Sequence, residues 1–114
     1  MRALSVGKNL VANTKTTMYA VPRQNIGKIV LLFAHNETAS AKNFSAWWYD
    51  KSNNVEIAIV ENYQLAAKAF LKFDGSYVVL DEGDEIRVQI ETGGECSVIV
   101  TFELEYKPTN QNGT

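Results

Sequence analysis

The sequence is poor in the residues on which disulfide-bonded and metal-binding proteins depend. It has one cysteine and one histidine in 114 residues, which excludes an internal disulfide, a multi-cysteine zinc site and a multi-histidine metal site. It also lacks any apolar run near the length of about 20 residues that a membrane-spanning helix needs. These shortages favour a domain with no metal, no cofactor and no membrane partner.

What remains is the composition of a folded domain. Apolar residues make up 46% of the chain and charged residues 21%, which are ordinary values for a globular protein. A chain of this length buries roughly 65% of its unfolded surface, enough for one hydrophobic core. We therefore expect a single domain over residues 1–114.

Charge is unevenly placed, although the net charge is only −2. Residues 1–36 carry basic side chains and no acid, whereas residues 74–106 are acidic apart from Arg87. This split lacks the clustered basic face of a nucleic-acid binder. It predicts either association between unlike ends of two copies or two solvated faces of opposite charge.

Alternation of apolar and polar residues predicts strands along most of the chain. The clearest are residues 86–91 and 96–106, and we interpret the turn at 92–95 between them as a hairpin. Further strands are predicted at residues 16–21, 28–36, 43–51, 55–60, 69–73 and 77–80. Their number and spacing predict an all-β fold, a single antiparallel β-sandwich that is jelly-roll-like, with about eight strands.

Glycines and the chain ends complete this expected fold. Gly83 is predicted to take a positive φ in the turn at 81–84, and Gly93 and Gly94 to close the turn at 92–95. Residues 25–27 are expected to form a turn, and the Asp-Gly pair at 74–75 to interrupt a strand. Weak patterning makes residues 1–13 an N-terminal arm that orders only against a neighbour, and 107–114 a flexible C-terminal tail.

Chemically reactive residues are few and isolated. His35 ends an apolar strand without a nucleophile or an orienting partner nearby in the sequence, and Cys96 falls on an apolar strand face. Both are therefore interpreted as structural residues. The acidic stretch at 81–85 lacks EF-hand spacing, so we interpret it as a turn, with calcium binding as the alternative. No catalytic residue is predicted.

Two neighbouring strands carry large apolar side chains at consecutive positions and therefore on both faces. A sandwich strand of a monomer is expected to have one wet face, and a large exposed apolar patch marks an interaction site. We therefore predict that Phe44 and Trp48 face the core. The residues predicted to face a neighbouring subunit are Val30, Leu32, Trp47 and Tyr49. The alternatives are that the same chain covers the two aromatic residues, or that they bind sugar.

Motifs spread over residues 16–105 resemble an ordered pattern. They are Met18-Tyr19-Ala20-Val21-Pro22, Gly27-Lys28-Ile29-Val30-Leu31-Leu32, Ala34-His35-Asn36, Leu71-Lys72-Phe73-Asp74-Gly75, Leu80-Asp81-Glu82-Gly83-Asp84-Glu85-Ile86-Arg87-Val88 and Val98-Ile99-Val100-Thr101-Phe102-Glu103-Leu104. The pattern is similar to that of small β-sandwich virion proteins of tailed bacteriophages, especially short-tailed marine and cyanobacterial phages.

The resemblance implies a non-enzymatic structural protein that is made in the host cytoplasm and located in the virion. It favours a capsid decoration or cement protein, whose partners are other copies of itself, as a homo-oligomer with a trimer favoured, and the major capsid protein or another virion protein. A neck or tail accessory protein is the first alternative. A carbohydrate-binding module for host attachment, using Trp47 and Tyr49, is the second.

Overall fold

The computed structural model describes residues 2–107, and for residues 75–77 it describes the backbone only. Within this part of the chain the fold is all-β, as predicted. The strands are β1 Arg2–Leu10, β2 Thr16–Ala20, β3 Asn25–Asn36, β4 Lys42–Asp50, β5 Val55–Leu65, β6 Phe70–Leu80, β7 Glu85–Ile90 and β8 Cys96–Tyr106.

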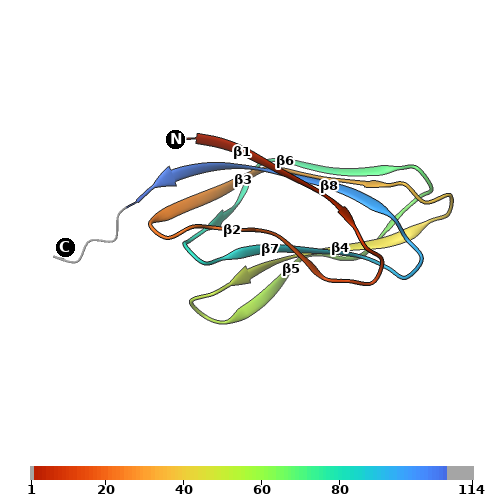
Figure 1. The fold of residues 1–114 in the computed structure, drawn as a ribbon, viewed down its shortest axis with the longest axis horizontal. Coiled ribbons are helices and arrows are strands. Elements are labelled where there is room, and N and C mark those ends of the chain that lie inside the picture. The colour runs from red at the N-terminus through yellow and green to blue at the C-terminus, as the bar shows by residue number, and fades with distance from the viewer. Residues whose placement is uncertain (1, 108–114) are drawn as a thin grey trace.

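The strands form two four-stranded antiparallel sheets packed face to face (Figure 1). Sheet A has the order β1-β8-β3-β6, and sheet B has the order β2-β7-β4-β5. Successive strands lie in different sheets except for β4 and β5, which form a hairpin. Eight strands in this order make a jelly roll. The predicted jelly-roll-like sandwich is confirmed.

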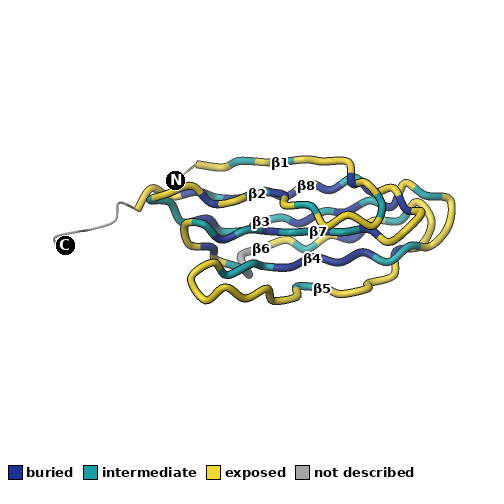
Figure 2. Tube along the Cα trace, turned by 60° about the horizontal axis from the view of Figure 1, so that its bottom comes forward, coloured by how far each residue is buried: buried dark blue, intermediate teal, exposed yellow. Residues whose placement is uncertain are grey.

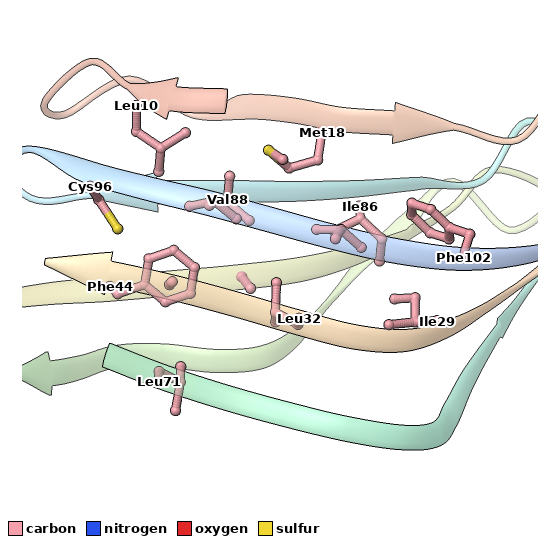
Figure 3. Close-up of a cluster of buried hydrophobic side chains, with 14 of the residues drawn as sticks. Leu10, Met18, Ile29, Leu32, Phe44, Leu71, Ile86, Val88, Cys96 and Phe102 are labelled. Atoms are coloured by element: carbon pink, nitrogen blue, oxygen red, sulfur yellow. The ribbon is translucent and has the colours of Figure 1, made fainter. Parts of the chain in front are cut away.

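The core fills the space between the sheets (Figure 3). Alternating residues of β7 and β8 supply much of it, as their period-two pattern predicts. Five of these side chains have no exposed surface: Val88, Ile90, Val98, Val100 and Phe102. Phe102 also packs its ring against Tyr19, with 4.8 Å between the ring centroids.

The turn at residues 92–95 joins the two sheets and not two paired strands. β7 belongs to sheet B and β8 to sheet A, so the predicted hairpin is wrong. The reversal itself is tight, because Gly93 has a φ of +82° and the Gly94 amide donates to the carbonyl of Glu91 at 3.0 Å. The apolar faces of β7 and β8 therefore face each other across the core.

Residues 2–10 form an edge strand of the sandwich, so the predicted N-terminal arm is wrong. β1 pairs with β8 along its whole length, from Arg2 opposite Leu104 to Leu10 opposite Cys96. Leu10 is buried in the core. Most other β1 side chains are exposed (Figure 2), which is why the sequence pattern there is weak. The segment is ordered within its own subunit.

A bulge in β3 changes which of its residues face the core. The pairing of β3 with both neighbours shifts between Ile29 and Leu31, which leaves Val30 as an extra residue. Ile29 and Leu32 are consequently both fully buried in the core. The predicted outward position of Leu32 is therefore wrong, whereas Leu31 and Phe33 lie on the outer face.

Several strand ends differ from the expected ones. β3 begins at Asn25, so the turn predicted at residues 25–27 is wrong. β5 continues past residue 60 to Leu65, with Asn62 at a φ of +53°. β6 runs through residues 74–75, where an interruption was predicted. The predicted C-terminal tail lies outside the described residues except for Lys107, whose amide donates to the Gln24 carbonyl at 2.6 Å.

Gly83 occupies a turn in which a side chain is strained. Its φ is +85°, and its amide donates to the Val21 carbonyl at 2.8 Å. We expect Gly83→Ala to lower the free energy of unfolding by about 1 kcal/mol, because L residues rarely adopt this conformation. Gly7→Ala is the matched control, because a Cβ there meets only ordinary contacts of 3.7 Å or more. Equal stabilities in urea titrations would contradict the strain argument.

Candidate functional site

Consecutive aromatic residues of β4 point to opposite sides of sheet B. Phe44 is fully buried in the core, and Trp48 packs partly against it. Trp47 and Tyr49 lie opposite Arg87 and Glu85 of β7, on the outer face. The strand pairing therefore confirms the predicted orientations, with Phe44 and Trp48 toward the core and Trp47 and Tyr49 toward the outer face.

The same chain covers the outward aromatic residues, which was the first alternative to a neighbouring subunit. Trp47 is only 8% exposed, and the Lys15 ammonium lies over its ring at 4.0 Å from the centroid. The guanidinium of Arg87 lies over the Tyr49 ring at the same distance. Both contacts are cation–π interactions. The expectation that these rings form an open patch for another subunit is therefore wrong.

Glu56 joins the two cations that cover these rings. One of its carboxylate oxygens lies 2.7 Å from the Lys15 ammonium, and the other lies 3.1 Å from the Arg87 guanidinium. Arg87 also pairs with Glu85 at 2.9 Å. The hydrogen bond from Lys15, and then that from Arg87, hold the pKa of Glu56 below its ordinary value.

This lowered pKa makes part of the stability depend on pH. Because Glu56 is harder to protonate in the folded state, its contribution is fully present above the ordinary glutamate pKa of about 4.3 and is lost as the pH falls below it. Glu56→Gln should lower the free energy of unfolding by up to about 1 kcal/mol at pH 7.

The difference between the wild type and Glu56→Gln should shrink as the pH falls below about 4. Denaturant titrations of both proteins across this range measure it. The conservative control is Glu82→Gln, at an exposed carboxylate that accepts one backbone hydrogen bond from Gln24 at 2.7 Å. A constant difference at all pH values would contradict the role of Glu56.

A small polar hollow lies beside Trp47 on the outer face of sheet B. Its volume is about 200 Å³. Amide and carboxylate side chains dominate its wall: Asn13, Asn43, Asn62, Gln89, Glu61 and Glu91. The indole N–H of Trp47 donates to Glu61 at 3.4 Å. Such a wall offers hydrogen bonds to a small hydroxyl-bearing ligand.

The outer face of sheet A is different, because strands β8, β3 and β6 present several apolar side chains there. Ile99 lies opposite Phe33, and Phe33 stacks on Phe70 with 5.4 Å between the ring centroids. Phe70 is 60% exposed and Ile99 is 40% exposed. With Leu31 and Val79 these three side chains form what we call the apolar face. The patch that the sequence predicted on β3 thus exists, but the bulge places Leu31 and Phe33 in it.

His35 and Cys96, the two isolated reactive residues of the sequence, lie near the same end of sheet A. His35 is half-buried on the outer face of sheet A, between Ser97 of β8 and Phe70 of β6. Cys96 is buried, and burial together with the nearby Glu37 carboxylate raises the pKa of its thiol to about 11. The thiol is therefore protonated at neutral pH, and a protonated thiol is a poor nucleophile.

The acidic turn is held by hydrogen bonds. Asp84 is 3% exposed, and its carboxylate accepts from the Trp48 indole at 3.1 Å and from the amides of Lys51 and Asp81 at 3.0 and 3.1 Å. Within residues 2–107, no three histidine, cysteine, aspartate or glutamate side chains are placed to hold a metal ion. The hydrogen bonds of Asp84 are those that the turn interpretation expects.

Asn36 is a structural residue that the sequence analysis did not single out. It is fully buried at the end of β3. Its amide nitrogen lies 3.0–3.1 Å from the carbonyls of Ser40, Leu65 and Ala66, and its oxygen accepts from the Thr38 amide at 2.8 Å. This one side chain ties the β3–β4 loop to the β5–β6 turn.

Comparison of the chain with models of known protein families and with curated proteins found no match. The described part of the chain contains no helix of the length and hydropathy needed to cross a membrane.

Proposed function

We propose that the chain is a non-enzymatic structural protein of a bacteriophage virion, and that its specific role is to decorate and stabilise the capsid. The apolar face of sheet A is the observation that carries this proposal. It places two phenylalanines, a leucine, an isoleucine and a valine on the outside of a sandwich that already has a complete core. Exposed apolar surfaces of this kind serve association with other proteins.

The positions of the motifs that resemble phage virion proteins also support the proposal. Val21, from the first motif, and the turn of Gly83 and Asp84 are far apart in the sequence. The Gly83 amide donates to the Val21 carbonyl at 2.8 Å, and the Val21 amide donates to the Asp84 carbonyl at 3.0 Å. The two motifs therefore form one structural unit, as parts of a single family pattern should.

The distribution of charge favours contacts through the sheet face over contacts between unlike ends. Lys28 of the basic segment lies 3.6 Å from Glu103 of the acidic segment, and Lys15 pairs with Glu56. The fold thus neutralises within one subunit part of the charge that the sequence separates. Apolar contact through this face is the stronger remaining basis for assembly with another copy, and the rest of the surface is left for the major capsid protein.

The stoichiometry of purified particles tests the proposed role. A decoration protein should be present at a copy number near that of the major capsid protein, and it should stay with the heads when heads and tails are separated. A neck or tail accessory protein would be present in about a dozen copies and would follow the tails. Absence from purified particles would contradict a virion role altogether.

Carbohydrate binding for host attachment is the second candidate function, and the polar hollow beside Trp47 is the observation that favours it. Its amides and carboxylates can donate to and accept from sugar hydroxyls. Titration of the free protein with a panel of monosaccharides, followed by tryptophan fluorescence, tests this function. Gln89→Ala, which removes one of the amide side chains that line the hollow, should weaken a fluorescence response caused by sugar binding there. An unchanged response would mean that the sugar binds elsewhere.

A further inference from the structure

The outer face of sheet A has the layout of an interface between two proteins. Pairing across the sheet places Gly7, Ile99, Phe33 and Lys72 in one row, and Ser5, Thr101, Leu31 and Asp74 in the next. In these two rows Ile99, Phe33 and Leu31 lie on the central strands β8 and β3, whereas Lys72 and Asp74 lie on the edge strand β6. This is the arrangement found in specific interfaces, with an apolar centre and a polar surround.

The face is large enough for a stable complex. Strands about 4.8 Å apart and a rise of about 3.3 Å per residue make four strands of this length roughly 19 Å wide and 36 Å long. Each copy would thus cover roughly 700 Å², and two copies together roughly 1,400 Å². Specific protein interfaces bury about 1,200–2,000 Å² in total.

The charges on this face suit a second copy of the same chain. Its lysines and carboxylates form two mixed pairs, Lys28 with Glu103 at 3.6 Å and Lys72 with Asp74 at 3.5 Å. Glu105, which lies on the same side of β8 as Glu103, adds a third carboxylate. The face therefore carries both signs, and the lysines of one copy can lie against carboxylates of the other. Gly7, on the edge strand β1, adds a position without a side chain that leaves room for the partner.

Either two-fold arrangement brings opposite charges together. An axis parallel to the strands lays β8 over the partner's β3, so that Glu103 meets the partner's Lys28 and Ile99 meets the partner's Phe33. An axis perpendicular to the strands places Lys72 over the partner's Asp74. Both are closed two-fold contacts of the commonest oligomer type.

We infer that the protein forms a two-fold homodimer in which the outer faces of the two A sheets pack against each other. This inference deepens the assembly role proposed above and rests on it for the setting in which the dimer works. It replaces the trimer that the resemblance favours with a dimer, because a contact that uses the same face of both copies closes at two subunits. The edge strands and the outer face of sheet B remain free for a capsid partner.

The mass of the purified protein in solution, measured by light scattering or sedimentation, tests the dimer. The wild type should have twice the chain mass of 12.7 kDa, and Ile99→Glu, which places a charge at the centre of the face, should have the mass of one chain. Ile57→Glu is the matched control, because Ile57 is 46% exposed on an edge strand of sheet B. It should leave the dimer intact.

A monomeric or trimeric wild type would overturn the inference, as would an Ile99→Glu protein that keeps the dimer mass. Circular dichroism verifies that each variant is folded. If Ile99→Glu does not fold, Phe70→Ser makes the same test at the first residue of β6. The two proposals can fail separately. A dimer in solution that is absent from particles would contradict only the virion role. A monomer that is present on particles would contradict only the inferred dimer.

Discussion

Replacing Asn36 with aspartate is expected to lower the free energy of unfolding by about 3–5 kcal/mol. The side chain has no exposed surface, and its amide nitrogen points at three backbone carbonyls, those of Ser40, Leu65 and Ala66. A carboxylate in its place would bury a negative charge among acceptors, with no donor except the Thr38 amide. Denaturant titration at pH 7 measures the loss.

The pH dependence of this variant identifies the cause. Burial among carbonyls raises the pKa of the new carboxyl group above its unfolded value of about 3.9. The variant should therefore recover stability relative to the wild type as the pH falls toward 4, when the group becomes neutral and can donate. Asn54→Asp is the control, because Asn54 is exposed and keeps its role as acceptor from the Tyr49 hydroxyl at 2.7 Å. A small loss of unfolding free energy that does not change with pH would contradict the structural role of the Asn36 hydrogen bonds.

Truncation of Phe102 to alanine should cost about 3–5 kcal/mol of unfolding free energy. The ring is fully buried between the sheets and packs on Tyr19, with 4.8 Å between the ring centroids. The cavity left behind borders two sheets that cannot easily close over it. Tyr106→Ala, on the same strand but 65% exposed, should change stability by about 0.5 kcal/mol or less. Similar values for the two variants would contradict the position of the core.

The strand pattern was predictable where one face of a strand is wet. In β7 and β8 the alternation of apolar and polar residues identifies the buried side directly, and Val88, Val98 and Phe102 lie in the core as expected. β3 is apolar at every position of its centre, so the sequence does not indicate which residues point inward. The bulge at Val30 determines which residues face the core, and it places Leu32 there.

Local sequence patterns did not indicate which strands pair with each other over long distances in the sequence. A turn such as that at Gly93 looks the same whether it returns the chain to the same sheet or carries it to the other one. β1 has a weak pattern because an edge strand faces solvent along most of its length (Figure 2), and its order comes from pairing with β8. Likewise, the cover over Trp47 comes from Lys15, a loop residue distant in the sequence.

The sequence correctly predicted that an apolar patch lies outside the core, but it did not predict which residues form that patch. The reasoning that a strand with two apolar faces must leave a patch outside the core is correct for β3 and gives the apolar face of sheet A. The same reasoning is wrong for β4, because Lys15 and Arg87 cover the outward rings of Trp47 and Tyr49. Long basic side chains can cover aromatic surface with their stems and charges, and the sequence alone does not show where they will lie.

Cryo-imaging of phage particles that contain this chain tests most directly whether the protein is an assembly unit of the virion. Averaged maps should show paired jelly rolls on the outer surface of the head, with Phe33, Phe70 and Ile99 covered by the neighbouring copy. Density confined to the tail would contradict the decoration role, and a single jelly roll with sheet A facing solvent would contradict assembly through the apolar face.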